Sequence, residues 1–276
     1  MPTDAASATI PRFLYGTAWK EEATQRCVEA ALEAGFRGID TANQRVHYYE
    51  AGVGQALQQA PVPRSDLFLQ TKFTPRGGQD RRLPYDSNTP LATQVAQSFA
   101  SSLAHLGTDW LDSYLLHSPL TPGTLGGDDW EVWGAMESLH DRGQLRHLGI
   151  SNANLNQVRT LCERARIKPS FVQNRCFAKT RWDREVRTYC QQQGVIYQGF
   201  SLLTANAPVL NDERLQAIAE RTGKTRPQLV FRFALDAGML PLTGTTDPQH
   251  MRQDLQVLEF ELDPADHERI EQLAVS

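Results

Sequence analysis

Eight short apolar segments, each followed by a longer stretch with helical periodicity, run through this chain. Several segments are apolar almost throughout, as parallel strands covered on both faces are. The intervening stretches carry apolar residues at positions i, i+3, i+4 and i+7, and two of them end in a glycine where a helix cap would lie. The segments begin at Phe13, Phe36, Leu67, Trp110, Leu145, Phe171, Val195 and Met239.

This alternation predicts an α/β fold, a single-domain (β/α)8 TIM barrel that comprises residues 1–276. An open, doubly wound sheet is the alternative. Two helical patterns, at 211–223 and 263–275, exceed the eight units and are expected to be additional helices. No change in composition and no linker rich in proline or glycine divides the chain.

The charge and the cysteines exclude several classes of function. With 28 basic and 32 acidic side chains the net charge is −4, so nucleic acid is not an expected partner. The four cysteines form no CxxC pair and no histidine stands at zinc-finger spacing, so we expect free thiols and no metal site. No apolar run is long enough to span a membrane, and residues 1–11 lack the pattern of a secretory signal. We expect a cytoplasmic protein that is a monomer or a weak homo-oligomer.

Ionisable residues end three consecutive strands: Asp40, Lys72 and His117. The ends of adjacent parallel strands are neighbours, so these side chains should converge at the mouth of a barrel. Tyr48 and Tyr49 follow Asp40 on the loop above the same rim. A phenol beside an ammonium group, with a carboxylate to hold the ammonium and a histidine to orient the substrate, suits proton transfer to a carbonyl oxygen. None of these groups can supply two electrons, so reduction would need a hydride cofactor.

Other residues around this mouth are candidates for substrate contact. The loop from Phe73 to Pro90 is long and poor in apolar residues, and should shape the substrate site. Substrate-binding candidates are Trp19, Tyr49, Phe73 and Trp130, although Trp130 and Trp133 could equally pack a helix. The stretch "GVGQAL" from Gly52 imitates part of a dinucleotide fingerprint, but it does not directly follow a strand, and helix packing explains its glycines better.

The order of several motifs resembles that of the aldo-keto reductase family over nearly the whole chain. These motifs are "GTAWK", "GFRGIDTA", "VGQAL", "LFLQTK", "LDSYLLHSP", "LRHLGISN", the glutamine of "FVQN", and "GFS". The resemblance implies that Asp40, a tyrosine, Lys72 and His117 are catalytic, and that the cofactor is NADPH, with NADH possible. It implies that Ser151, Asn152 and Gln173 bind the nicotinamide amide, that Phe200 stacks on the ring, and that Ser201 and Leu203 contact the pyrophosphate. The remaining cofactor-binding candidates are Gly16, Thr17, Gly244, Thr245, Arg252 and Asp254.

The chain departs from the family pattern at the tyrosine. The family usually has its tyrosine five residues after the aspartate, where this chain has Arg45, and three before a glutamate, where it has His47. A branch with "HY" in this place and "GQD…PYD" in the next loop resembles the chain closely and favours Tyr48 over Tyr49. The long C-terminal loop of many relatives is missing, so we expect a more open site.

The second departure concerns the phosphate of NADPH. Relatives that use NADPH usually carry a lysine and a serine after the eighth strand and an arginine shortly afterwards; Gly244, Thr245 and His250 stand there instead. Free backbone amides at a helix N-terminus near Asp247, together with Arg252, could bind the phosphate in their place. We therefore expect the protein to use NADPH, but to prefer it over NADH less strongly than relatives with the lysine, serine and arginine do.

The most direct interpretation is NAD(P)H-dependent reduction of a small-molecule aldehyde or ketone to an alcohol. One alternative is a non-catalytic, cofactor-binding regulatory subunit of the same fold. Another is a barrel lyase that uses Lys72 to form a Schiff base.

Overall fold

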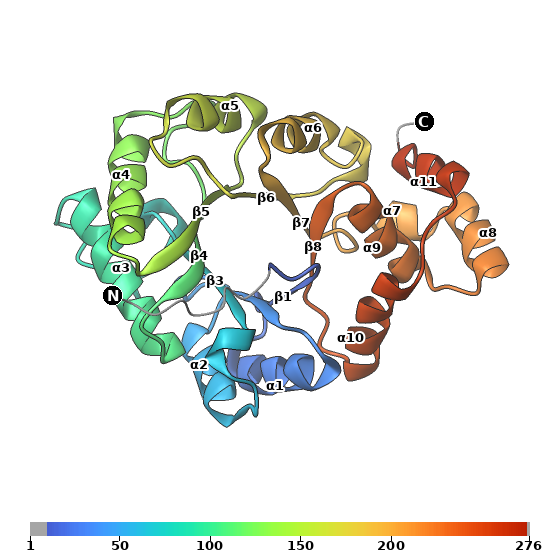
Figure 1. The fold of residues 1–276 in the computed structure, drawn as a ribbon, viewed down its shortest axis with the longest axis horizontal. Helices are drawn as coiled ribbons and strands as arrows, with labels where there is room; N and C mark the ends of the chain where they lie inside the picture. The colour runs from blue at the N-terminus through green and yellow to red at the C-terminus, as the bar shows by residue number, and fades with distance from the viewer. Residues whose placement is uncertain (1–9, 275–276) are drawn as a thin grey trace.

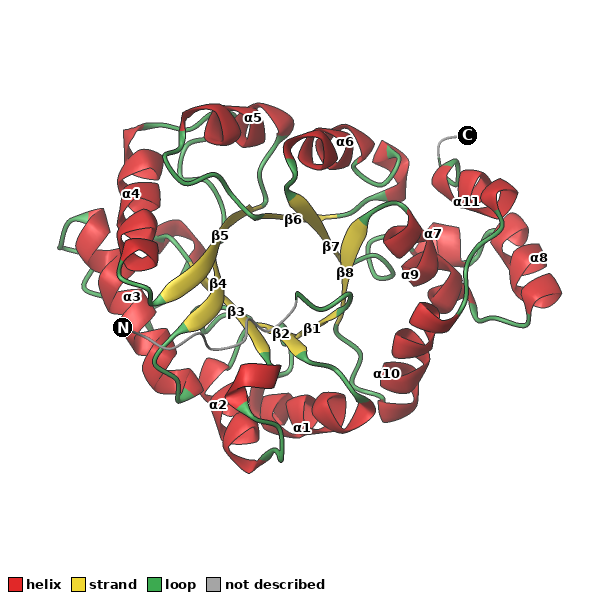
Figure 2. Cartoon of the chain, in the orientation of Figure 1, coloured by secondary structure: helices red, strands yellow, loops and turns green. Residues whose placement is uncertain are grey.

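Eight parallel strands close into a barrel in the computed structural model, which describes residues 10–274 (Figures 1 and 2). Each strand pairs with the next along the chain, and β8 pairs with β1. The predicted barrel is therefore confirmed and the open sheet is wrong. Residues 1–9, in which no secretory signal was expected, and residues 275–276 lie outside the described part.

Each strand overlaps one of the eight apolar segments of the sequence, and β3 and β6 extend one residue further. They are β1 (Leu14–Gly16), β2 (Gly38–Asp40), β3 (Phe68–Phe73), β4 (Leu111–Leu116), β5 (Leu145–Ser151), β6 (Phe171–Arg175), β7 (Ile196–Phe200) and β8 (Met239–Thr243). Asp40 is the last residue of its strand, Lys72 is one residue from the end of β3, and His117 directly follows β4. The strand ends therefore bring these three residues to one rim of the barrel.

The helices form an outer ring around the strands (Figure 1). They are α1 (Thr24–Ala34), α2 (Glu50–Gln59), α3 (Leu91–Leu106), α4 (Gly127–Asp141), α5 (Leu155–Arg164), α6 (Arg184–Gln193), α7 (Ala207–Leu210), α8 (Glu213–Thr222), α9 (Arg226–Asp236), α10 (Pro248–Leu255) and α11 (Pro264–Glu271). Short 3-10 helices span Glu21–Ala23, Arg64–Asp66, Arg76–Gly78, Ala178–Thr180 and Gln256–Glu259. The two predicted additional helices are α8 and α11.

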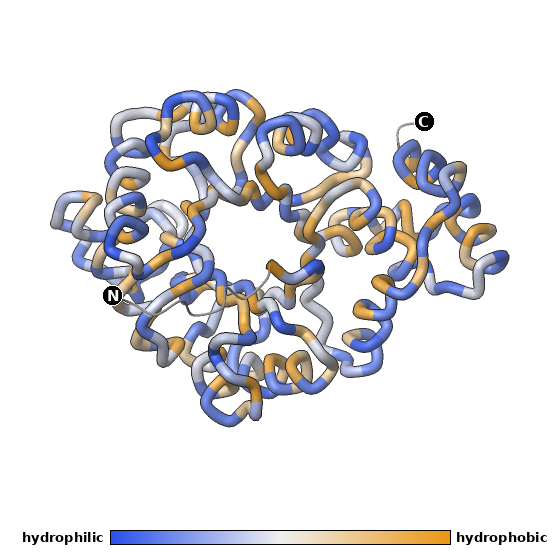
Figure 3. Tube along the Cα trace, viewed as in Figure 1, coloured by the Kyte–Doolittle hydropathy of each residue, from blue (hydrophilic) through white to orange (hydrophobic). Residues whose placement is uncertain are grey.

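The core has two parts, because successive side chains of a strand point to opposite faces. The larger part packs the outer face of the strands against the helices, whose tubes alternate between apolar and polar positions in Figure 3. A smaller apolar cluster occupies the inner face of the barrel; it consists of Leu14, Phe68, Leu115, Phe171, Leu240 and Leu242. The barrel interior is therefore a packed core rather than a channel.

The glycines of α2 serve helix packing, as the sequence predicts. A β-carbon on Gly54 would collide with the backbone oxygen of His105, so only glycine lets α2 approach the end of α3 this closely. The apparent dinucleotide fingerprint is thus part of the scaffold.

The four cysteines are free and buried. Within residues 10–274, no helix has both the length and the apolar character that crossing a membrane requires.

Candidate active site

Lys72 and Asp40 form a buried ion pair at the barrel mouth. The Lys72 ammonium lies 2.8 Å from both carboxylate oxygens of Asp40 and 2.8 Å from the backbone oxygen of Thr41. Lys72 is fully buried and Asp40 nearly so. Burial lowers the pKa of Lys72, and the Asp40 carboxylate opposes this shift. All three N–H groups of the ammonium are engaged, so the lysine is held rigidly.

His117 lies beside this pair as a neutral imidazole. Burial, together with the positive charge of Lys72, lowers the pKa of His117 to about 3. Its Nδ1 lies 2.7 Å from the hydroxyl of Thr74, and its backbone N–H donates to the Phe73 carbonyl at 2.8 Å. A hydroxyl that donates to Nδ1 leaves the proton of the neutral ring on Nε2. We assign this tautomer, which presents one N–H donor.

Tyr48 stands above Lys72 and His117. The Lys72 ammonium lies 5.3 Å from the centroid of the Tyr48 ring, and the His117 ring lies 5.9 Å away, edge to face. Burial, and to a smaller extent the Asp40 carboxylate, raises the pKa of Tyr48. Because burial is the larger cause, the pKa of Tyr48 lies above its ordinary value even though the Lys72 ammonium is close to the ring. The phenol is therefore protonated at neutral pH and available as a proton donor.

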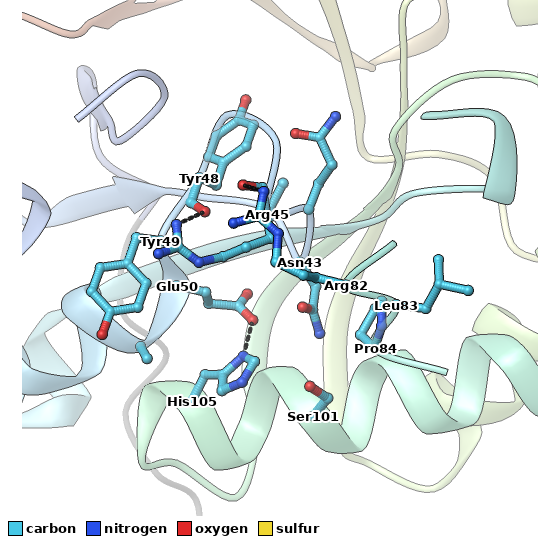
Figure 4. Close-up of a pocket in the computed structure, with 13 residues that line it drawn as sticks. Asn43, Arg45, Tyr48, Tyr49, Glu50, Arg82, Leu83, Pro84, Ser101 and His105 are labelled. Atoms are coloured by element: carbon cyan, nitrogen blue, oxygen red, sulfur yellow. Dashed lines mark hydrogen bonds and ion pairs between the residues drawn. The ribbon is translucent and has the colours of Figure 1, made fainter. Parts of the chain in front are cut away.

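Tyr49 takes a different direction from its neighbour. Figure 4 shows the two rings on different sides of the loop, with their hydroxyl groups pointing apart. The Tyr49 ring stacks on the guanidinium of Arg45, 4.2 Å from ring centroid to Cζ. The two tyrosines directly precede α2, whose first residue, Glu50, accepts hydrogen bonds from Thr71 on β3 and His105 on α3.

A cavity of about 360 Å³ lies beside this loop (Figure 4). Residues 42–45, 48–51, 82–84 and two side chains of α3, Ser101 and His105, line it. Tyr48 and Tyr49 both border the cavity, but Lys72 and His117 do not. The long loop after β3 therefore packs against the tyrosine loop, where the Gln44 side chain donates to the Gly78 carbonyl and Gln79 to that of Asn43.

The three residues expected near a nicotinamide amide lie together at the end of β5 and on β6, and Asn152 directly follows β5. Ser151 pairs in register with Gln173, and Asn152 donates through its side chain to the His117 carbonyl at 2.9 Å. Asn152 has a left-handed backbone with φ of 56°, which asparagine tolerates better than most residues. The Gln173 amide nitrogen donates to Asp40 and Gln198, so only its oxygen is left for another partner.

Five further cofactor-binding candidates lie at or just after the ends of β7 and β1. Phe200 is half-buried against the apolar cluster of the barrel interior, so one ring face is held at the mouth. Ser201 follows with φ of 55°, and Leu203 is half-buried against the outer core. Gly16 lies close to the Thr243 carbonyl, and Thr17 is buried with its hydroxyl on the Asp40 carbonyl at 3.1 Å.

The residues after β8 surround a buried lysine. The Lys20 ammonium donates to the Gly244 carbonyl at 2.9 Å, and Thr245 accepts from the Tyr15 hydroxyl at 2.8 Å. Burial lowers the pKa of Lys20 to about 8. Lys20 thus holds an ammonium group next to Gly244, where the family pattern has a lysine of its own.

Helix α10 does not present the free amides that the sequence led us to expect. The Asp247 carboxylate accepts from the backbone N–H groups of Gln249 and His250, at 2.7 and 3.4 Å, and so caps the helix itself. Arg252 is exposed. Asp254 is buried, accepts from the Thr243 hydroxyl at 2.7 Å, and has its pKa raised by burial to about 6. The Asp247 carboxylate places a negative charge at the N-terminal end of α10, and this charge would repel a phosphate.

The substrate-binding candidates are dispersed. Trp19 stands on the rim, 71% exposed, with its ring 4.0 Å from that of His47, and its role as a pocket wall stays a prediction. Phe73 is fully buried against Tyr85, because it follows Lys72 on the strand and points to the opposite face. Trp130 on α4 packs against the guanidinium of Arg164 at 5.0 Å. The expectation that Phe73 and Trp130 line the pocket is therefore not supported by their contacts.

Four polar residues of the site were missed from the sequence: Lys20, Gln70, Thr74 and Gln198. Lys20 and Thr74 follow β1 and β3 within a few residues, so their position past a strand end was the available signal. Gln70 and Gln198 lie inside β3 and β7, and buried amides within strands require hydrogen-bond partners.

Comparison with known proteins agrees with this geometry. The profile of the Aldo/keto reductase family matches residues 14–275. The chain is 30% identical over 270 residues to an uncharacterized oxidoreductase of Bacillus subtilis, YtbE, covering 96% of this chain and 89% of that protein. It is 30% identical over 253 residues to the glyoxal reductase of the same bacterium, covering 91% and 83%.

Solved structures give the same result. An aldo-keto reductase from a Medee basin deep-sea metagenome library superposes with a TM-score of 0.83 at 25% identity, covering 96% of this chain and 92% of that one. The Bombyx mori aldo-keto reductase in complex with NADP superposes with a TM-score of 0.79 at 27% identity, covering 95% and 89%. The barrel, the residues at its mouth and these matches agree. The chain belongs to the aldo/keto reductase family of oxidoreductases.

Proposed function

We propose that this protein reduces an aldehyde or ketone to an alcohol with NADPH, and that Tyr48 is the general acid. The observation that carries the proposal is the convergence of a protonated phenol, a buried Lys72–Asp40 pair and a neutral His117 at one barrel rim. The assignment of Tyr48 rather than Tyr49 rests on the side-chain directions, since the Tyr49 ring turns to Arg45.

Each residue has a distinct part in this chemistry. The His117 Nε2–H donates a hydrogen bond that orients the substrate carbonyl oxygen, and Tyr48 transfers its proton to that oxygen as negative charge develops. The Lys72 ammonium stabilises the phenolate that remains, and Asp40 keeps the ammonium in place and compensates its burial. When bound, the cofactor supplies the hydride that these side chains cannot provide.

The residues present fit a nicotinamide dinucleotide. Ser151, Asn152 and the oxygen of Gln173 would bind the carboxamide, and Phe200 offers a ring face for stacking. The buried Lys20 ammonium beside Gly244, with Ser201 and its left-handed backbone, would hold the pyrophosphate. The NADP complex of the Bombyx mori relative supports this choice of cofactor.

Two alternatives have less support. A Schiff base needs a free amine on Lys72, but the ammonium gives all three hydrogen bonds to Asp40 and Thr41. A purely regulatory subunit has no need of the complete set of acid, lysine, aspartate and histidine.

The deciding experiment follows NADPH oxidation by absorbance with a panel of aldehydes and ketones. Glyoxal belongs in the panel because a relative is named glyoxal reductase. Absence of turnover with every carbonyl, despite cofactor binding, would favour the regulatory alternative.

The pH dependence of reduction should show no ionisation of His117 between about pH 5 and 7. The pKa of His117 is lowered to about 3, so the neutral ring persists as the pH falls through the usual histidine range. The raised pKa of Tyr48 keeps the acid protonated over the same window. The measurement is kcat/KM for an aldehyde at saturating cofactor. Because the pKa of Asp254 is raised to about 6, the profile is repeated in Asp254→Asn. A loss of activity centred near pH 6.5 in both proteins, absent from His117→Asn, would contradict the assignment.

The preference for NADPH over NADH should be small and limited by Asp247. Its carboxylate occupies the amides of α10 and places a negative charge where a 2′-phosphate would approach. Asp247→Asn keeps a cap but removes the charge, so the ratio of kcat/KM for NADPH over NADH should rise about tenfold, whereas Arg252→Ala should lower it. Asp263→Asn is the matched control, since the Asp263 carboxylate caps α11 by accepting from the Ala265 N–H. A native preference of several orders of magnitude that survives Arg252→Ala would disprove this account.

A further inference from the structure

Four polar side chains meet across the inside of the barrel, in the layer that contains Asp40 of the ion pair. Asp40 on β2 pairs in register with Gln70 on β3, and Gln173 on β6 pairs with Gln198 on β7. Residues paired in register point to the same face, and here both pairs face the interior. The two pairs come from opposite sides of the barrel and are joined by hydrogen bonds.

Gln70 and Gln198 form a reciprocal pair of amides. The Gln70 nitrogen donates to the Gln198 oxygen at 2.8 Å, and the Gln198 nitrogen donates to the Gln70 oxygen at 3.0 Å. Both side chains are fully buried. Other interior positions of this barrel, such as Leu115, Phe171 and Leu240, are apolar. Because a buried amide stabilises a fold no better than an apolar side chain, packing alone does not account for two of them here.

The first consequence concerns Asp40. Its Oδ1 accepts from the Gln70 nitrogen at 2.7 Å and the Gln173 nitrogen at 3.0 Å, in addition to the Lys72 ammonium at 2.8 Å. The two amides approach from β3 and β6, so they fix the carboxylate from two sides. The position of the carboxylate in turn decides where the Lys72 ammonium lies beneath the Tyr48 ring.

The second consequence concerns Gln173. Its nitrogen donates to the Gln198 oxygen at 2.9 Å as well as to Asp40. An inverted Gln173 amide would direct its oxygen at the Asp40 carboxylate and at the Gln198 oxygen, which would be repulsive. The Gln173 oxygen therefore stays directed away from these acceptors, and it accepts no hydrogen bond from any residue between 10 and 274. That oxygen can accept an N–H group of a nicotinamide carboxamide.

We propose that Gln70 and Gln198 are positioning residues of the reductase. Their amide pair holds the Asp40 carboxylate under Lys72 and selects the Gln173 amide orientation that accepts the cofactor carboxamide. This proposal rests on the proposed function. It differs from a purely structural role because it requires that loss of the pair weaken cofactor binding and proton transfer even where stability is restored.

The test uses Gln198→Met, Gln70→Met and the double variant in the full chain. Methionine preserves length and volume but removes the hydrogen bonds. Each single variant leaves one amide buried without its partner and should lower the Tm by about 3–6 °C, whereas the double variant should recover most of this loss. Ser113→Ala is the matched control. Ser113 faces the interior next to Gln70 in register, and its buried hydroxyl has no partner within the described residues.

The functional readouts are the NADPH dissociation constant from fluorescence titration, and kcat and KM for one good aldehyde. In Gln198→Met and in the double variant, the dissociation constant should rise about tenfold, because the Gln173 amide loses the hydrogen bond that fixes its orientation. The kcat should fall about tenfold, because the Asp40 carboxylate and the Lys72 ammonium are then less well positioned. The KM for the aldehyde should change little. Ser113→Ala should match the native protein in all three quantities.

Native binding and native kcat in the double variant would overturn this inference while leaving the proposed function intact. So would a catalytic deficit that disappears together with the stability deficit, since the pair would then be structural only. A native protein that neither binds nor oxidises NADPH would instead overturn the proposed function itself. The double variant keeps the test valid if a single variant fails to fold.

Discussion

Tyr48→Phe is expected to lower kcat for carbonyl reduction by about 10²–10⁴-fold, the usual cost of losing a general acid. The substitution removes one hydroxyl and leaves the ring in its contacts with Lys72 and His117. Cofactor affinity should therefore stay close to native. Steady-state kinetics with one aldehyde, combined with NADPH titration, give both quantities.

Tyr49→Phe is the matched control for this prediction. It removes the same hydroxyl from a ring that stacks on Arg45 on the other side of the loop, so its kcat should stay close to native. The reverse pattern would assign the acid to Tyr49. Small effects from both variants would exclude a phenol from the rate-determining proton transfer.

Lys72→Met is expected to cost about 3–5 kcal/mol of stability, since it leaves the Asp40 carboxylate buried without its cation. That cost is a large fraction of the 5–15 kcal/mol that typically stabilises a domain. It should also lower kcat by at least about 10²-fold, because nothing then stabilises the phenolate of Tyr48. Urea unfolding followed by fluorescence measures the first effect.

The double variant Asp40→Asn/Lys72→Met separates stability from catalysis. With both charges removed, the buried site is neutral and stability should return toward the native value, while activity stays lost. Lys20→Met is a useful contrast in the unfolding experiment. Lys20 is buried against carbonyl oxygens rather than a carboxylate, so its loss strands no opposite charge. A cost for Lys20→Met equal to that for Lys72→Met would show that the ion pair is not the source of the effect.

Much of the site followed from local sequence. Asp40, Lys72 and His117 stand at or next to the ends of apolar runs, and a strand of defined period places its last side chain on the rim. Once consecutive strands pair in parallel, as β2, β3 and β4 do, these residues must be neighbours. The additional helices α8 and α11 were likewise visible from their periodicity.

Other features depended on contacts between distant segments. Sequence could not show that Asp247 blocks the amides of its own helix, because its geometry depends on how the chain enters α10. Phe73 is a different case, because its position next to Lys72 on a strand already implied that it points to the opposite face. The direction of the Tyr48 pKa shift is set mainly by burial of the phenol, which depends on how the tyrosine loop packs onto the barrel mouth.

The sequence by itself determined the alternation of strands and helices, and thus the barrel and the residues on its rim, because hydrophobic periodicity is a local property of the chain. Only the tertiary structure decided which tyrosine turns toward Lys72, and that Gln70 and Gln198 meet 128 positions apart in the chain. Side-chain directions in loops and hydrogen bonds across a barrel depend on closure of the sheet. No short stretch of sequence contains that information.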